Sequence, residues 1–116
     1  GQARFAQALA LGGRANTVAR TATAYAHRDA LFTANLTVAL PTPAPSTDER
    51  DAAQAWIDAG FAVLDPYSTH ETYQNYVDPH LADWRRAYYA ENYPRLVAVK
   101  RAVDPHNFFT FAQSIG

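Results

Sequence analysis

Cysteine and methionine are both missing from this chain of 116 residues. Without cysteine there is no disulfide, no thiolate metal site and no cysteine nucleophile in the segment. Without methionine the sequence does not begin at an initiator residue, so we expect it to be the C-terminal part of a longer polypeptide. Its abundance of alanine suggests a GC-rich bacterial source.

Charge and long apolar runs are scarce as well. The net charge is −1 and charged residues make up 18% of the chain, so no basic surface points to nucleic acid or to an anionic membrane. No apolar run approaches the roughly 20 residues that cross a bilayer. The sequence leaves localisation open.

Apolar residues make up 48% of the chain, enough to build a core. Residues 3–10 are rich in alanine and predict a short helix that ends at Gly12-Gly13. Residues 21–27 alternate small and larger side chains, as an extended segment does. Ser46 and Glu49 have capping-box spacing and open a predicted helix over 47–64, where Gly60 favours a close packing contact.

Residues 31–40 form the clearest predicted strand, with β-prone residues and no internal Gly or Pro. Alternation places Phe32, Ala34, Leu36 and Val38 on an apolar face that should be core. Thr33 and Asn35 lie on the opposite face, which mixes polar and apolar residues and should border a polar, hydrated space.

Residues 67–80 are polar, aromatic and non-periodic, which is typical of a loop that carries function. A short helix follows with Leu81, Trp84 and Tyr88 on one face. A second helix starts near Tyr93, with Asn92 as its expected N-cap, and ends before Asp104-Pro105. Strands followed by helices indicate an α+β fold.

Tyr73 and Asn75 would point to the same side of an extended segment, offering a phenol and an amide together. A phenol becomes a useful base only when positive charge or hydrogen bonds favour its phenolate. The alternative is a tyrosine at a domain edge with a satisfied hydroxyl. Spacing alone leaves both interpretations open.

An ordered series of motifs narrows this choice. It runs through Tyr73-Gln74-Asn75-Tyr76-Val77-Asp78, Trp84, Tyr88-Tyr89, Asn92-Tyr93-Pro94-Arg95-Leu96 with Lys100, Asp104-Pro105-His106-Asn107-Phe108 and Gln113-Ser114-Ile115. The series resembles the C-terminal segment of the berberine bridge enzyme-like family of FAD-linked oxidases. An upstream stretch, Ala22-Thr23-Ala24-Tyr25-Ala26-His27-Arg28, is similar to part of that family's substrate domain.

The resemblance implies a two-domain flavoprotein of the vanillyl-alcohol-oxidase-like fold. Residues 1–66 would finish an antiparallel-sheet substrate domain with covering helices, and 67–116 would return to the FAD-binding domain, which belongs to the rest of the same polypeptide. Any covalent attachment of FAD would use residues upstream of this chain.

By the same resemblance, Tyr73 matches the catalytic base and Asn75 a residue near the flavin, so both are expected to contact FAD. Asn35, with Thr33, matches positions that face the substrate, and as an amide Asn35 would position it. The implied reaction oxidises an alcohol, sugar or phenolic natural product of secondary metabolism, with hydride transfer to flavin N5 and O2 as acceptor.

Two alternatives stay open beside this interpretation. A non-catalytic binding or structural module derived from a flavoprotein would keep the scaffold residues, with less reason to keep Tyr73 and Asn75. His27-Arg28 either orients the site or forms a structural pair. The histidines and carboxylates lack the spacing of a metal site, so we expect none.

Overall fold

The computed structural model describes residues 2–41 and 43–116, which form two compact units. The first unit takes the described residues up to Leu11 and from Leu31 to Thr69. The second takes Gly12–Ala30 and His70–Gly116. No helix in the described part of the chain has the length and apolar character needed to cross a membrane.

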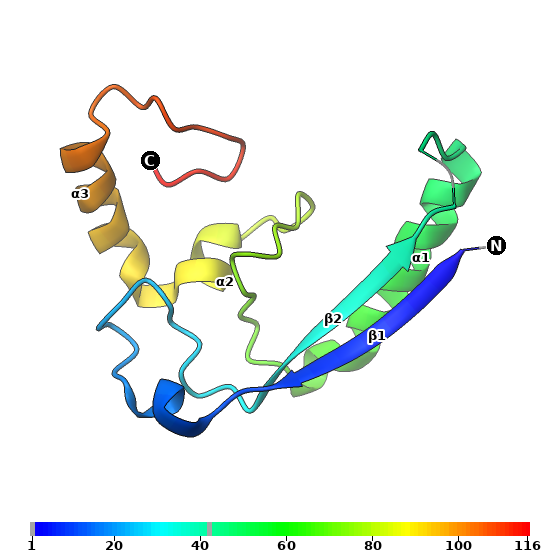
Figure 1. Ribbon diagram of the computed structural model, residues 1–116, viewed down its shortest axis with the longest axis horizontal. Coiled ribbons are helices and arrows are strands. Elements are labelled where there is room, and N and C mark those ends of the chain that lie inside the picture. The colour runs from blue at the N-terminus through cyan, green and yellow to red at the C-terminus, as the bar shows by residue number, and fades with distance from the viewer. Residues whose placement is uncertain (1, 42) are drawn as a thin grey trace. The chain divides into compact units, whose positions relative to one another are not determined.

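A two-stranded antiparallel ribbon forms the first unit's sheet (Figure 1). Strand β1, Ala3–Ala10, pairs with β2, Phe32–Ala39, in a register that sets Gln7 opposite Asn35. The strand expected over 31–40 is confirmed, whereas the helix expected over 3–10 is wrong. Pairing along the whole length of β1 outweighs the modest helical preference of its alanines.

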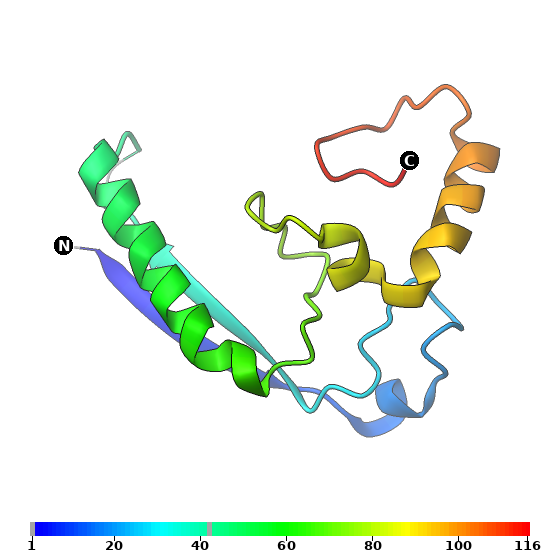
Figure 2. The ribbon, with the colours of Figure 1, turned by 180° about the vertical axis from the view of Figure 1, so that it is seen from behind.

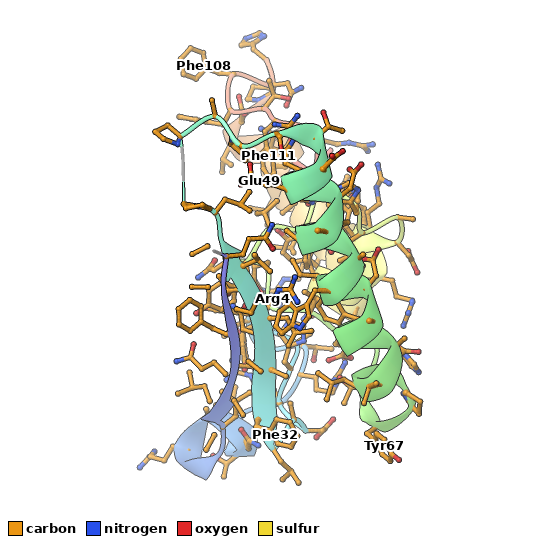
Figure 3. The ribbon with its side chains drawn as sticks, turned by 90° about the vertical axis from the view of Figure 1, so that its right-hand side faces the viewer. Arg4, Phe32, Glu49, Tyr67, Phe108 and Phe111 are labelled. Atoms are coloured by element: carbon orange, nitrogen blue, oxygen red, sulfur yellow. The ribbon has the colours of Figure 1, made fainter. Side chains whose placement is uncertain are left out.

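Helix α1, Thr47–Leu64, lies along one face of this ribbon (Figures 2 and 3). The capping box is present: Ser46 Oγ accepts from the Glu49 amide, and the Glu49 carboxylate accepts from the Ser46 amide at 2.9 Å. A Cβ added to Gly60 would come 2.5 Å from Leu36 Cδ1, so the close contact expected at Gly60 is confirmed. Leu36, from the face of β2 expected to be core, therefore packs on α1. The rest of that expectation is wrong, because Phe32 is 57% exposed, Ala34 is exposed and Val38 is only half-buried.

Short helices build the second unit. They are a 3-10 helix over Gly13–Thr17, α2 over Trp84–Tyr89, a 3-10 turn over Ala90–Asn92, and α3 over Tyr93–Val103. The buried side chains of α2 include Tyr88, 2% exposed, and Trp84, whose ring meets the Tyr93 ring edge-on. Both helices after residue 80 were expected; α2 supplies buried side chains to this unit's core, whereas no residue of α3 is buried.

Two local expectations in this unit are wrong. Residues 21–27 are not extended: the Ala22 amide donates to the Ala19 carbonyl in a turn, followed by bends. Asn92 precedes α3 without making a capping hydrogen bond. Its side-chain NH2 donates to the Arg20 carbonyl, 72 residues away, at 2.8 Å.

The described chain is α+β, as expected from the sequence, with a small antiparallel sheet and covering helix in one unit and short helices in the other. This is consistent with a fragment of a larger flavoprotein. The division into a substrate-domain part, 1–66, and a return segment, 67–116, stays a prediction.

Candidate active-site loop

Tyr73 lies in a loop that turns immediately after it. The Tyr76 amide donates to the Tyr73 carbonyl at 3.0 Å, so the segment is a turn and not the extended run expected from the sequence. The turn still joins the two side chains, because Asn75 Nδ2 donates to the Tyr73 hydroxyl at 2.8 Å. The phenol oxygen thus has a fixed donor.

Aromatic rings surround Tyr73. Tyr25 meets it edge-on with ring centroids 5.8 Å apart, and Tyr76 does so at 5.7 Å. Tyr25 in turn lies against the His27 ring at 5.1 Å and under the Arg28 guanidinium at 4.6 Å. The His-Arg pair therefore reaches the loop through Tyr25, which favours an orienting contribution over a remote structural one.

A charged cluster holds the loop on its upstream side. Glu71 accepts from Arg20 Nη2 at 2.5 Å and lies 3.0 Å from His27 Nδ1. Burial alone would raise the pKa of Glu71, but the hydrogen bonds from Arg20 and His27 hold it below its ordinary value. The hydrogen bond that Arg20 donates to Glu71, with those it donates to Glu91, raises the pKa of Arg20. Glu71 and Arg20 are thus both charged at neutral pH.

Backbone contacts complete the support. The Thr72 amide donates to the Ala87 carbonyl in α2 at 2.9 Å, just before Tyr73. On the downstream side the Asp78 amide donates to the Tyr88 hydroxyl at 2.9 Å, and the Asp78 carbonyl accepts from Gln113 Nε2 at 2.7 Å. Tyr73 and Asn75 therefore lie in a short span between two anchored points.

Thr33 and Asn35 belong to the other unit, on the face of β2 away from Leu36. Thr37 Oγ1 donates to Asn35 Oδ1 at 3.0 Å, which confirms that alternate residues of the strand share this face. With its carbonyl engaged, Asn35 has its side-chain NH2 left to donate. Gln7 lies opposite it across the ribbon, so two side-chain amides occupy neighbouring positions.

Sequence reasoning missed several of the residues that support the loop. Arg20, Glu71 and Gln113 lie far apart in the chain, and their contacts with each other or with the loop span 35 to 51 residues. No local spacing signals such pairs. Tyr25 and Gln113 were part of the motifs that resemble the family, but those motifs predicted no contact between either residue and the loop.

The two loop side chains fit a cofactor with hydrogen-bonding edges. Asn75 is exposed, and its Oδ1 accepts no hydrogen bond from any described residue, so it can accept from a ligand N–H. Tyr73 is half-buried beside it, and its hydroxyl oxygen accepts from Asn75 Nδ2. The Asn75 acceptor fits an N–H on the polar edge of an isoalloxazine ring.

Comparison with known proteins gives consistent matches. Residues 72–116 match the family model described as "Berberine and berberine like". The FAD-linked oxidoreductase YgaK of Bacillus subtilis is 37% identical over 91% of the chain. Aclacinomycin-N/aclacinomycin-A oxidase of Streptomyces galilaeus is 35% identical, and berberine bridge enzyme-like 12 of Arabidopsis thaliana 33%, each over 90% of the chain.

The chain spans 22% of the length of each of these three relatives. No solved structure matches it significantly. The family match falls on the segment that contains the Tyr73 loop, α2, α3 and the C-terminal residues. The chain therefore belongs to the berberine bridge enzyme-like family of FAD-linked oxidoreductases, and residues 72–116 are its C-terminal family segment.

Proposed function

We propose that this chain is part of an FAD-dependent oxidase that oxidises an alcohol, sugar or phenolic natural product. The observation that carries the proposal is the hydrogen bond from Asn75 to the Tyr73 hydroxyl, in a loop held at both ends. The Asn75 donor fixes where the phenol oxygen lies, and this oxygen is the atom that would take up the substrate proton. An amide beside a reactive phenol is also suited to bind a polar cofactor edge.

In the proposed step, Tyr73 removes the proton of the substrate hydroxyl while the adjacent carbon gives up a hydride and becomes a carbonyl. When bound, FAD supplies the two-electron acceptor at N5, with O2 as the final acceptor that yields hydrogen peroxide. Asn75 would help to hold FAD and would keep its donor on the phenol oxygen. Thr33 and Asn35 would orient the substrate through a hydroxyl and an amide.

The sheet unit would bind the substrate, and the Tyr73 loop would carry out the proton transfer. Residues 1–66 would belong to the substrate domain. Residues 67–116 would return to the FAD-binding domain, whose residues lie in the rest of the polypeptide. Covalent attachment of FAD would use residues in that remainder. Those relatives named as oxidases or FAD-linked oxidoreductases support this proposal.

The deciding experiment is Tyr73→Phe in the intact protein. We expect kcat to fall at least about 10²-fold because the ring is kept and only the proton acceptor is lost. Flavin content, measured by visible absorption, should stay equal to that of the wild type. Peroxide release over a panel of alcohols, sugars and phenols gives the rate.

Tyr67→Phe serves as the matched control, because Tyr67 is 89% exposed on a turn before the loop. It should leave kcat unchanged. A Tyr73→Phe protein that turns over at the wild-type rate removes Tyr73 from the role of base. An intact protein that is colourless and fails to take up added FAD overturns the oxidase proposal and leaves the non-catalytic module.

A further inference from the structure

Gln113 is an exception in the C-terminal stretch of the chain. From Pro105 to Gly116, every residue of which is described, Gln113 alone is buried, at 6% exposure. The aromatic side chains just before it, Phe108, Phe109 and Phe111, are 59–80% exposed. A stretch that leaves its phenylalanines outside and buries a glutamine is organised around that side chain's hydrogen bonds.

Both ends of the Gln113 amide are used. Nε2 donates to the Asp78 carbonyl at 2.7 Å, and Oε1 accepts from the Tyr88 hydroxyl at 3.2 Å. The Tyr88 oxygen itself accepts from the Asp78 amide at 2.9 Å. The three residues close a ring of hydrogen bonds that satisfies the donor and the acceptor of the Asp78 backbone at once.

This ring lies at the downstream end of the Tyr73 loop. The upstream end is held where the Thr72 amide meets the Ala87 carbonyl, also in α2. Only residues 73–77 lie between the two anchors, and they contain both Tyr73 and Asn75. The downstream anchor of the phenol-bearing loop is therefore Asp78, held by Gln113, which lies 35 positions beyond Asp78 in the chain.

We propose that Gln113 is a positioning residue for Tyr73, acting through Asp78 and Tyr88. The inference rests on the proposed role of Tyr73 as proton acceptor. A reacting group displaced by about 1 Å can lose about 10²-fold in rate, even when the change lies far from the chemistry. Loosening the downstream anchor moves the loop without removing any group that touches substrate or FAD.

The test is Gln113→Met in the intact protein, which keeps an unbranched side chain and removes both hydrogen bonds. We expect kcat to fall about tenfold or more, with KM changed less than about threefold and flavin content unchanged. Hydrogen exchange should speed up at the Asp78 amide. Tyr93→Phe is the control: its hydroxyl donates to the Gly116 carbonyl and accepts from Arg85 Nε, each at 3.1 Å, so it removes contacts of the same C-terminal stretch and of α2 while keeping every hydrogen bond of the ring.

Each result decides the proposal. It stands if Gln113→Met lowers kcat and exposes the Asp78 amide while Tyr93→Phe does neither. It fails if Gln113→Met keeps the wild-type kcat, or if Tyr93→Phe lowers kcat equally. Gln113→Glu keeps an acceptor for Tyr88 and covers the case in which the methionine variant does not fold. If Tyr73→Phe is fully active, the assignment of Tyr73 as the base is wrong, and the positioning role of Gln113 falls with it. The hydrogen-exchange rate at the Asp78 amide then still shows whether Gln113 holds the hydrogen-bond ring together.

Discussion

Glu71 shows how a single side chain can determine whether the candidate site is assembled. It lies two residues before Tyr73, and its carboxylate, 13% exposed, meets Arg20 and His27 from the segment 12–30. A carboxylate this buried needs its donors, since losing them would leave a charge without compensation. Glu71 therefore ties the loop to the segment that also supplies Tyr25.

Replacing Glu71 by Gln should destabilise the intact protein by about 1–3 kcal/mol at neutral pH, because hydrogen bonds to a charged group are lost. The folded-state pKa of Glu71 lies below its ordinary 4.5, so its stabilisation is fully present above pH 4.5. That stabilisation disappears as pH falls through the folded-state value. The Tm gap between wild type and Glu71→Gln should therefore be widest above pH 4.5 and narrow below it.

Thermal unfolding followed across this pH range measures the gap. Glu91→Gln is the matched control, because Glu91 also pairs with Arg20 at 3.0 Å but is 43% exposed, and its effect should be smaller. A gap for Glu71→Gln that is independent of pH would show that the carboxylate charge contributes nothing to the folded state.

At the scale of elements, the sequence predicted what local chemistry determines. The α1 boundaries follow from the capping box at Ser46 and from periodic apolar residues, and α3 ends where Pro105 requires it. The β1 assignment failed because its pairing with β2 joins residues up to 36 positions apart, which no window around Ala3–Ala10 contains. The same limit hid the ring through Gln113.

The contact between α1 and β2 makes a prediction about Gly60. In an exposed helix Gly→Ala stabilises by about 1 kcal/mol. Here the new methyl group would lie 2.5 Å from Leu36 Cδ1, and relieving such overpacking costs about 1–3 kcal/mol. We expect Gly60→Ala to destabilise by about 0–2 kcal/mol instead of stabilising.

A double-mutant cycle with Leu36→Ala separates the gain in helix propensity from the cost of overpacking against Leu36. Once Leu36 is truncated, the methyl group at position 60 has room, so Gly60→Ala should become stabilising in that background. Tm values of the four proteins provide the cycle. Additive changes would mean that Leu36 does not oppose a side chain at position 60, contrary to the packing seen along the ribbon.

At the scale of the whole chain, apolar surface is left uncovered on both units. Among residues 2–41 and 43–116 the buried apolar residues are few: Ala26, Ala53, Trp84, Ala87 and Tyr88. Large side chains remain exposed on the strands and in the C-terminal stretch, among them Leu9 at 58%, Phe32 at 57% and Phe108 at 80%. Such surface is what the remainder of a polypeptide would cover, given that the chain spans 22% of its relatives.

We therefore expect residues 1–116, produced alone, to lack a cooperative unfolding transition, because burial this limited does not offset the conformational entropy of ordering the chain. The near-UV circular dichroism of the isolated chain should change gradually on heating. A dye that binds exposed apolar surface should fluoresce with the isolated chain before it is heated. The intact protein, measured beside it, should show a sharp transition and little dye binding. A sharp transition in the isolated chain would mean that its two units are stable without the polypeptide that we expect to cover Phe32 and Phe108.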